Sequence, residues 1–308
     1  MKIAITGATG FIGGYMVKAM LAAGHEVRAL CRPGREDALP ERDRVEMHIG
    51  DLTDADSMRG FLGGCNYLIH LASAHDHFSY EVMQRVNVYG TEVLLADAKE
   101  NAADDFQFIV ISSAVIGVPV YSYYRDSKRV QEKIIRGSGI PWASFRPTLV
   151  YGVGDQRHTA PLLRKCAARK GTYWIPHEGL SKINPVHVDD LIDAVLKFFD
   201  YDRAKDVDCI YEIAGPEGVP FNEFIDLTVA VTGGRVKRRN IPRRWVERAI
   251  FLKGLFTDVT KERRGAGYFS LHHDHNITAA KTELDWNPRP YAEGIREVAA
   301  GDWWRTES

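Results

Sequence analysis

The chain has 308 residues, of which 45% are hydrophobic and 26% charged, and its formal net charge is −1. This length supports one large domain or two modest domains with a packed core. The composition is that of an ordinary globular protein and argues against global disorder. A net charge close to zero argues against a nucleic-acid-binding protein, which needs a strongly basic face.

The ends and the apolar stretches carry information on location. The chain starts directly on the strand-like segment MKIAIT, so we expect no secretion signal. The longest apolar candidate, 249–256, is interrupted by Lys253 and Gly254 and falls short of the roughly 18 residues of a membrane span. The four cysteines have no CxxC or metal-like spacing, which favours reduced thiols. We therefore expect a cytoplasmic protein without a membrane span.

The first half of the chain alternates short β-branched runs with longer helical patterns. In chain order, the patterns predict a strand at 3–6, a helix at 11–23, strands at 27–31, 45–48 and 67–72, a helix at 80–100, a strand at 106–112, a helix at 124–136 and a strand at 142–146. Strands that alternate with helices of this length pair in parallel through right-handed crossovers. The fold class predicted is α/β, a Rossmann-type doubly wound parallel sheet with helices on both faces.

The second half is organised differently. After about Val150 the alternation becomes irregular and richer in proline, glycine and aromatic residues, and the helices predicted at 188–200 and 220–232 do not follow single strands. We expect residues 1–150 to form a dinucleotide-binding domain to which residues 184–213 return. Residues 151–308 are expected to form a smaller C-terminal substrate-binding lobe over the carboxyl edge of the sheet, where α/β proteins hold ligands.

A glycine-rich turn joins the first strand to the first helix. Glycines at this spacing allow a tight turn, contact of the pyrophosphate with the backbone, and close packing of helix on strand. The N-terminus of the helix then offers N–H groups and partial positive charge to phosphates. The alternative is a glycine-rich turn without a ligand. The residues expected to bind the cofactor here are Gly7, Thr9, Gly10, Phe11, Ile12 and Gly13.

The end of the second strand indicates which dinucleotide is bound. A carboxylate there would hold the ribose hydroxyls and repel a 2′-phosphate, but the position holds Cys31, followed by Arg32. The planar guanidinium of Arg32 suits a phosphate, and Arg35 adds charge, so NADP(H) is favoured over NAD(H). The alternative is a solvated surface arginine. Asp51 is placed either to meet the adenine amine or to cap a helix starting near Thr53.

Tyr124 and Lys128 are four residues apart on a predicted helix and therefore share a face. A neighbouring ammonium lowers the pKa of a phenol, which can then exchange a proton with an oxygen at the reacting carbon. The lysine can also hold a ribose hydroxyl and so position the nicotinamide. Tyr201 and Lys205 repeat the spacing, but they lie in the irregular half.

Two serines end the strand that precedes this helix. The hydroxyl of Ser113 could hydrogen-bond the carbonyl or the developing alkoxide of a substrate. Ser112 is a competitor for the same role, and either serine could simply satisfy backbone groups at the strand end.

At these residues the chain resembles the extended short-chain dehydrogenase/reductase family, also called the NAD-dependent epimerase/dehydratase family. The resemblance covers nearly the whole chain. Besides TGATGFIG and the Tyr124/Lys128 pair, it rests on Gly50-Asp51-Leu52, His70-Leu71-Ala72, Asn87-Val88-Tyr89-Gly90-Thr91, Arg146-Pro147-Thr148-Leu149-Val150-Tyr151-Gly152, Val186-His187-Val188-Asp189-Asp190-Leu191 and the segment 281–290.

The resemblance implies roles for further residues. It supports Ser113, Tyr124 and Lys128 as the catalytic set, and it implies a homodimer formed through the helices at 80–100 and 124–136. Asp51 and Leu52 would flank the adenine, Leu71 and Ala72 would line the cofactor, Asn87 would hold the inner helices or the cofactor, and Pro147 would pack near the nicotinamide.

Two departures from the family pattern refine the expected chemistry. Tyr124 follows Ser113 by only 11 positions, a shorter interval than in members that act on sugar nucleotides, whose longer loop touches the substrate. Arg32 beside Cys31 resembles the NADP-using, dihydroflavonol reductase-like members, whereas epimerases that retain NAD usually carry an acid there.

Two other patterns are given structural interpretations. His272, His273, Asp274 and His275 could suggest a metal, but adjacent residues cannot converge on one ion, so no metal is expected. Residues 243–256 interleave basic with apolar side chains, which is compatible with a membrane-surface helix. We expect instead a lobe helix that packs its apolar side inward. At the substrate cleft, such a helix would favour a hydrophobic substrate.

The leading hypothesis is an NADP(H)-dependent oxidoreductase that transfers hydride to or from the carbonyl or alcohol group of a small molecule. One alternative is a sugar-nucleotide epimerase or dehydratase with retained NAD. Another is a non-catalytic cofactor-binding sensor. Substrate contacts are expected from Arg157, His158, Trp174 and His177, none of which identifies the ligand.

Overall fold

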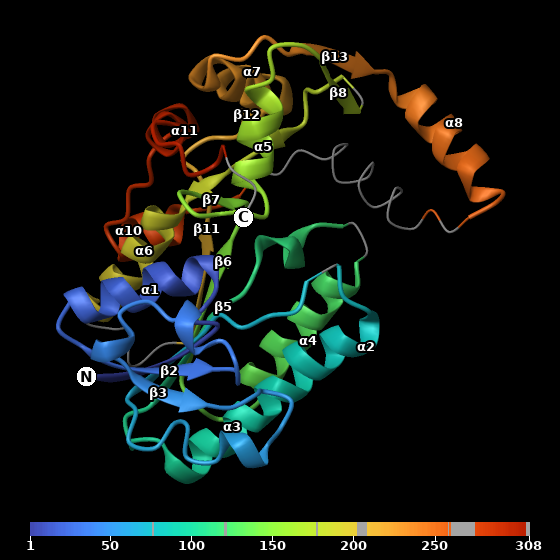
Figure 1. Cartoon of the computed structure of the whole chain (residues 1–308). Helices are drawn as coiled ribbons and strands as arrows, with labels where there is room; N and C mark the ends of the chain where they lie inside the picture. The colour runs from blue at the N-terminus through green and yellow to red at the C-terminus, as the bar shows by residue number, and fades with distance from the viewer. Residues whose placement is uncertain are drawn as a thin grey trace.

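A seven-stranded parallel sheet forms the centre of the computed structural model, which describes residues 1–75, 77–119, 122–176, 178–201, 208–257, 259 and 275–305 (Figure 1). The strand order is β11-β6-β5-β4-β1-β2-β3, and every pairing is parallel. The strands are β1 (Lys2–Thr6), β2 (Glu26–Cys31), β3 (Glu46–Ile49), β4 (Tyr67–His70), β5 (Gln107–Ile111), β6 (Trp142–Pro147) and β11 (Cys209–Ile213). The predicted Rossmann-type fold is confirmed.

Alternation along the strands supplies a core on each face of the sheet. Ile3 and Ile5 point into a cluster with α1 (Phe11–Ala22) and α6 (Val188–Asp200), whereas Ala4 faces a second cluster. That second cluster packs against α3 (Gly90–Asn101) and α4 (Tyr123–Arg136). Successive strand residues point to opposite faces, so the side chains of one buried strand pack into both core clusters.

The stretch predicted as one helix over 80–100 has three parts. It begins as α2 (Tyr80–Met83), continues as the π-helical segment η4 (Gln84–Tyr89) and ends as α3. A π-helical turn inside an α-helix often occurs at a functional site. Here it carries the buried Asn87.

A smaller lobe follows β6 and packs around a third apolar cluster (Figure 1). Its elements are β7 (Val150–Tyr151), α5 (Thr159–Cys166), β8 (Thr172–Pro176), β9 (Lys182–Ile183), β10 (Val186–His187), β12 (Val219–Pro220), α7 (Phe221–Thr232), β13 (Lys237–Ile241), α8 (Arg243–Gly254) and α11 (Tyr291–Ala299). Helix α10 (Thr278–Glu283) packs instead against the first core cluster of the central sheet. Between β10 and β12 the chain returns to the sheet as α6 and β11.

The segment 281–290, one of the family-like motifs of the sequence, is hydrogen-bonded to α6. The Trp286 indole is buried and donates a hydrogen bond to the carbonyl oxygen of Asp190 over 2.8 Å. Arg289 Nε lies 3.0 Å from Asp190 Oδ1 and donates to it. Both contacts link residues about 100 positions apart, so they hold the C-terminal segment against α6, which packs on the central sheet.

Two predicted features are wrong. No α-helix begins near Thr53; a short 3₁₀ turn, η3 (Asp56–Met58), follows instead, and Gly60, with a φ of 72°, ends the helical conformation soon after it. The segment 243–256 does form helix α8, but none of that helix's residues is buried. It therefore does not pack an apolar side inward. The remaining short turns are η1 (Glu36–Ala38), η2 (Arg42–Arg44) and η5 (Ala114–Gly117).

Among the described residues, no helix combines the length and the apolar character needed to cross a bilayer. All four cysteines are free; Cys31, Cys65 and Cys166 are buried, and Cys209 is half-buried.

Candidate active site

The glycine turn lies between the carboxyl ends of β1 and β4. Gly7 has a φ of 71°, and a Cβ there would lie 2.8 Å from the Ala72 backbone nitrogen. A Cβ on Gly13 would lie 2.0 Å from the Gly7 carbonyl oxygen, so any side chain would force α1 away from the turn. The strand order reverses here, where doubly wound sheets bind ligands.

The first turn of α1 is open to an anion. Its N-cap, Gly10, has no side chain that could accept hydrogen bonds from the first amides of the helix. Those N–H groups and the helix dipole therefore remain for a phosphate. Thr9, Phe11 and Ile12 are half-buried at the same turn.

The end of β2 carries exposed arginines and no carboxylate that could bind the ribose hydroxyls. Cys31 is fully buried, and its thiol donates a hydrogen bond to the Arg32 carbonyl oxygen over 3.6 Å. The side chains of Arg32 and Arg35 are exposed, and neither forms an ion pair with another described residue. Both guanidinium groups are therefore available to a phosphate.

Asp51 caps a turn through one carboxylate oxygen only. Its Oδ1 accepts hydrogen bonds of 2.8 Å from both the backbone nitrogen and the hydroxyl of Thr53. Oδ2 has no partner among the described residues, so the turn-capping role leaves an oxygen for an amine. Leu52 is 5% exposed, and a Cβ on Gly90 would lie 3.0 Å from its Cβ, which places Leu52 against α3.

Leu71 and Ala72 lie beside the glycine turn. The Ala72 backbone nitrogen donates a hydrogen bond to Thr6 Oγ1 over 3.2 Å, and both Leu71 and Ala72 are half-buried. Pro147 is buried at the end of β6 and is paired in register with Ile213 of β11.

Lys128 is buried under the carboxyl edge of the sheet and is only 1% exposed. Its Nζ donates to Gln131 Oε1 over 2.5 Å and to the Ile111 carbonyl oxygen over 3.3 Å. An ammonium has three donors, so one remains for a further partner. Burial lowers the pKa of Lys128 to about 8, although the charge of Glu132 opposes the shift.

A hydrogen-bonded chain runs from Lys128 to the glycine turn. Because an ammonium can only donate, it fixes the Gln131 oxygen, and the Gln131 Nε2 then donates to His70 Nε2 over 3.1 Å. His70 Nε2 is thus an acceptor, and the ring proton on Nδ1 faces Thr6 Oγ1 at 2.7 Å. Burial, and then the charge of Lys128, lower the pKa of His70 to about 3, so the ring is neutral.

Asn87 joins the loop after β4 to α4. Its Oδ1 accepts from the Ala74 nitrogen over 2.7 Å, and its Nδ2 donates to the Ala74 carbonyl oxygen over 2.9 Å. The same Nδ2 donates to Ser127 Oγ over 2.9 Å. Asn87 is fully buried, so these bonds fix the loop against the helix that carries Lys128.

Glu132 supplies a fixed negative charge below the lysine. Arg146 Nη2 donates to Glu132 Oε2 over 2.5 Å, and Ser144 Oγ donates to Oε1 over 2.7 Å. Burial opposes ionisation of Glu132, but the hydrogen bonds, that of Arg146 first, outweigh it and lower its pKa. The carboxylate therefore stays charged and helps to keep Lys128 protonated.

The two serines differ in exposure. Ser112 is 5% exposed, whereas Ser113 is half-buried and caps η5, its hydroxyl accepting from the Val115 nitrogen over 3.3 Å. Tyr124 is half-buried near the start of α4, one helical turn before Lys128. The Lys128 contact with Ile111 brings the lysine to the residue that immediately precedes Ser112.

A histidine covers the tyrosine. The rings of His75 and Tyr124 have centroids 4.9 Å apart and planes inclined by 34°. In the same loop, His77 Nδ1 lies 2.8 Å from Arg157 Nη2 of the lobe. A guanidinium only donates, so His77 Nδ1 accepts. Burial, and then the charges of Arg157 and Lys128, lower the pKa of His75 to about 3.

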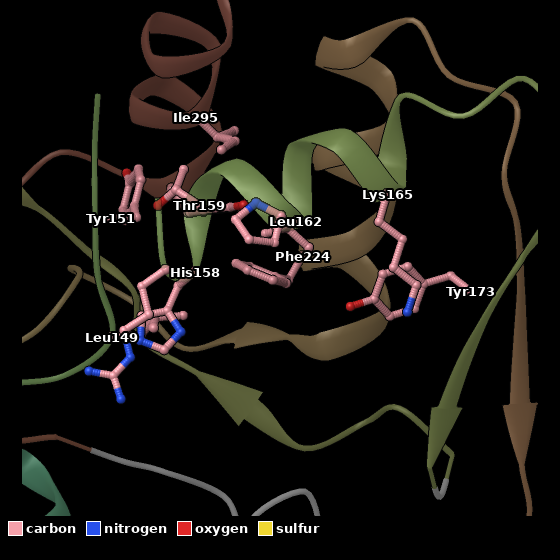
Figure 2. Close-up of a pocket in the computed structure, with 12 residues that line it drawn as sticks. Leu149, Tyr151, His158, Thr159, Leu162, Lys165, Tyr173, Phe224 and Ile295 are labelled. Atoms are coloured by element: carbon pink, nitrogen blue, oxygen red, sulfur yellow. The ribbon is translucent and has the colours of Figure 1, made fainter. Parts of the chain in front are cut away.

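A pocket of about 300 Å³ opens in the lobe (Figure 2). Its wall is mainly aliphatic and aromatic, and the cationic residues Arg157 and Lys165 also line it. The lining residues are Leu149, Tyr151, Arg157, His158, Thr159, Pro161, Leu162, Lys165, Tyr173, Phe224, Tyr291 and Ile295.

Some of the residues expected to contact the substrate line this pocket. Arg157 and His158 line this pocket, but Trp174 does not and is 55% exposed. Its neighbour Tyr173 lines the pocket instead, because adjacent residues of strand β8 point to opposite sides. No residue of α8 lines the pocket, and His177 lies outside the described residues.

A family model described as NAD dependent epimerase/dehydratase family matches residues 3–214, most of the chain. The chain belongs to this family. The match includes the glycine turn, the Tyr124/Lys128 helix and the strands that position them.

Several relatives of this family member are named as reductases or dehydrogenases. A ceramide reductase of Caulobacter vibrioides is 31% identical over 64% of this chain and 60% of its own length. A 2-alkyl-3-oxoalkanoate reductase of Stenotrophomonas maltophilia is 24% identical over 76% of both chains. A 3-beta-hydroxysteroid dehydrogenase of Mycolicibacterium neoaurum is 28% identical, but the match spans only 49% of its length and 50% of this chain.

Solved structures share the fold at low identity. The crystal structure of gox2253 has a TM-score of 0.82 at 23% identity, covering 98% of this chain and 97% of that one. A UDP-glucuronic acid 4-epimerase from Bacillus cereus, in complex with NAD, has a TM-score of 0.75 at 19% identity, covering 99% and 97%.

The structure adds His70, His75 and Gln131 to the residues around the site of this epimerase/dehydratase-family chain. Within the described part of the chain, no cluster of potential metal ligands occurs. His275 lies 3.4 Å from Glu212, whereas His272, His273 and Asp274 lie outside the described residues. In the second Tyr/Lys pair of the sequence, Tyr201 packs against the first core cluster, and Lys205 lies outside the described residues.

Proposed function

We propose that the protein is an NADP(H)-dependent oxidoreductase that interconverts a carbonyl group and an alcohol on a small, largely apolar molecule. One observation carries the proposal. Tyr124 lies one helical turn from the buried Lys128, and a chain of hydrogen bonds joins Lys128 to the glycine turn, where a Cβ would not fit. When bound, the nicotinamide supplies or accepts the hydride.

The residues of the chain transfer the proton, hold the cofactor and orient the substrate. Tyr124 donates a proton to the substrate oxygen, or removes one, as general acid or base. Lys128, kept charged by Glu132 although burial favours its neutral form, stabilises the tyrosinate and uses its remaining donor on a ribose hydroxyl. Ser113, the less buried serine, orients the substrate oxygen.

The preference for NADP(H) rests on the end of β2. Exposed Arg32 and Arg35 have no anionic partner among the described residues, and the position where an acid would repel a 2′-phosphate holds the buried Cys31. Asp51 Oδ2 is free of described partners and can accept a hydrogen bond from the adenine amine.

The preference for an apolar substrate rests on the lobe pocket. Leu149, Leu162, Phe224 and Ile295 present aliphatic and aromatic surface, as ligand sites for apolar molecules do. The relatives are named for a ceramide, a 2-alkyl-3-oxoalkanoate and a 3-beta-hydroxysteroid, all largely hydrocarbon. Arg157, which also lines the pocket, would meet a polar end of such a molecule.

The test begins with the purified protein as it exists. Mass spectrometry of the released cofactor, followed by turnover assays with NADPH and NADH, would be run on apolar ketones and on sugar nucleotides. Exchangeable NADP and NADPH-dependent ketone reduction support the proposal. Tightly held NAD with sugar-nucleotide turnover would replace it with the epimerase or dehydratase function. Cofactor binding without turnover across both panels would favour the sensor.

We also propose that the protein is a homodimer that pairs through α2–η4–α3 and α4. Apolar side chains stand exposed on these helices, and Tyr80 contacts Tyr123 across them with ring centroids 5.1 Å apart. The exposed set is Tyr80, Val82, Tyr89, Tyr123 and Val130. Sedimentation equilibrium of the wild type and a Val130→Glu variant tests the proposal, since a dimer should become monomeric.

A further inference from the structure

Helix α8 extends from the outer end of the lobe, beyond β13 (Figure 1). Side chains that proteins normally bury are exposed along it and in the turn that follows: Trp245 is 53% exposed, Phe251 61% and Phe256 87%. Isolated exposed apolar residues are ordinary, but a contiguous set marks an interaction surface. No residue of α8 lines the lobe pocket, so this surface is separate from the candidate active site.

The exposed apolar residues follow the helical period. Trp245, Ala249, Leu252 and Phe256 are spaced by four, three and four residues and therefore form one stripe along α8 and the turn after it. Leu252 is 50% exposed and lies in the middle of this apolar stripe. The stripe resembles the buried face of an amphipathic helix, but the described residues do not cover it.

The charge around the stripe is strongly positive. Residues 243–256 contain four basic residues and one acidic residue in a chain with a net charge of −1. At about 100° per residue, Arg248 and Lys253 fall on opposite flanks of the stripe. Arg243 pairs with Glu247 over 2.6 Å, whereas Arg244 and Arg248 form no ion pair with any described residue.

This combination matches one kind of partner. An apolar stripe between cations fits a membrane surface, where the stripe enters the boundary of the acyl chains and the cations meet lipid phosphates. A second copy of the chain would bring two such basic segments together, and like charges oppose that contact. We propose that α8 is a membrane-surface helix that binds a bilayer containing anionic lipids. The proposal does not depend on the reaction catalysed.

The test is sedimentation of the full chain with vesicles of phosphatidylcholine alone and with about one third phosphatidylglycerol. We expect binding to the anionic vesicles that weakens with added salt. Trp245→Ser with Leu252→Ser removes the stripe, and Arg244→Gln with Arg248→Gln removes two charges. Each double variant should bind on the order of tenfold more weakly.

Two controls match these changes. Leu180→Ser removes an apolar side chain that is 64% exposed outside α8, and Arg59→Gln with Lys99→Gln removes two exposed charges from the first half of the chain. Both should bind vesicles as the wild type does. Thermal unfolding followed by circular dichroism checks that each variant is folded.

Three results would overturn the proposal. One is the absence of binding to anionic vesicles by the folded wild type. Another is equal binding by the stripe or charge variant and the wild type. The third is light scattering that shows α8 mediating self-association, with the stripe variant losing an oligomer instead of vesicle binding.

Discussion

The imidazole ring of His75 packs against the phenol ring of Tyr124, with centroids 4.9 Å apart. The two side chains come from different places, the loop after β4 and the start of α4, and Asn87 holds these two segments together. Arg157 of the lobe reaches the same loop through His77. The lobe is thus in hydrogen-bonded contact with the loop that covers the tyrosine.

Arg157→Gln should raise the pKa of His75 from about 3. Burial is the larger cause of the low value and remains in the variant, but the repulsive charge of Arg157 is removed, so the rise should be partial. NMR titration of the His75 ring measures it. Lys165→Gln removes a cation elsewhere in the pocket and should leave His75 unchanged. An unaltered His75 titration in Arg157→Gln would contradict the prediction.

Tyr124→Phe should lower kcat by roughly 10²- to 10⁴-fold, the usual contribution of a general acid or base. Cofactor affinity should stay nearly unchanged, because the phenol hydroxyl acts on the substrate. Steady-state kinetics and a cofactor titration check the two parts. Tyr123→Phe is the matched control, since that neighbouring ring contacts Tyr80. Full activity of Tyr124→Phe would remove the mechanism.

Gln131→Glu should raise the pKa of Lys128 above about 8. It places a carboxylate where the amide oxygen now lies 2.5 Å from Nζ, and an opposite charge favours the protonated amine. The limb of the pH profile of kcat/KM that reports loss of the lysine proton should move to higher pH. Gln131→Met removes the acceptor without adding charge and should not move that limb upward. A limb at the same pH in Gln131→Glu and the wild type would show that Gln131 does not position the lysine.

His70→Gln should weaken the acid sensitivity of the fold. The pKa of His70 falls from its usual 6.5 to about 3 on folding, so the unfolded chain binds the extra proton between these values. The stability that depends on a neutral ring is present above pH 6.5 and is lost as the pH falls, by about 1.4 kcal/mol per pH unit. Urea unfolding at several pH values measures the slope. The variant should have a shallower slope below pH 6.5 and a wild-type slope above it; equal slopes throughout would exclude this role.

Arg32→Ser should raise the dissociation constant for NADPH by roughly 10- to 100-fold, the value of charge-assisted hydrogen bonds to a phosphate. NADH, which has no 2′-phosphate, should bind about as before. Titration of both cofactors by intrinsic fluorescence provides the comparison. Arg59→Ser, which removes an exposed arginine paired with Asp56, is the control. Equal changes for the two cofactors would refute the proposed preference for NADP(H).

The sequence predicted the sheet except for β11, because most of its other strands are short apolar runs next to a helix of regular period; no strand was predicted at Cys209–Ile213. The first core follows directly from that pattern, as Ile3, Ile5 and Val17 illustrate. The pattern could not show that 80–100 contains a π-helical segment, because Gln84–Tyr89 is only six residues long and too short to give a hydrophobic period of its own. Nor could it place α8, since an amphipathic period indicates an apolar face without naming what covers it.

The sequence predicted those parts of the site that form local motifs. The glycine turn, Tyr124 and Lys128 are recognisable by spacing, but the partners of Lys128 are set by tertiary contacts. Gln131 is three residues from Lys128, a spacing that places it on the same helical face, so this partner had a usable signal. His70, the last residue of β4, was noted only as part of a family motif, and His75 had no signal beyond its position after that buried strand.

The course of the chain between the two halves limits how the molecule can be dissected. A fragment ending near Val150 would lack β11, the strand beside β6, and α6, which packs over Phe145 and Ile109 in the first core. It would expose a strand edge and an apolar sheet face together, a combination prone to aggregation. Truncation is therefore unsuited to separating cofactor binding from substrate recognition, and point substitutions in the intact chain are the appropriate tools.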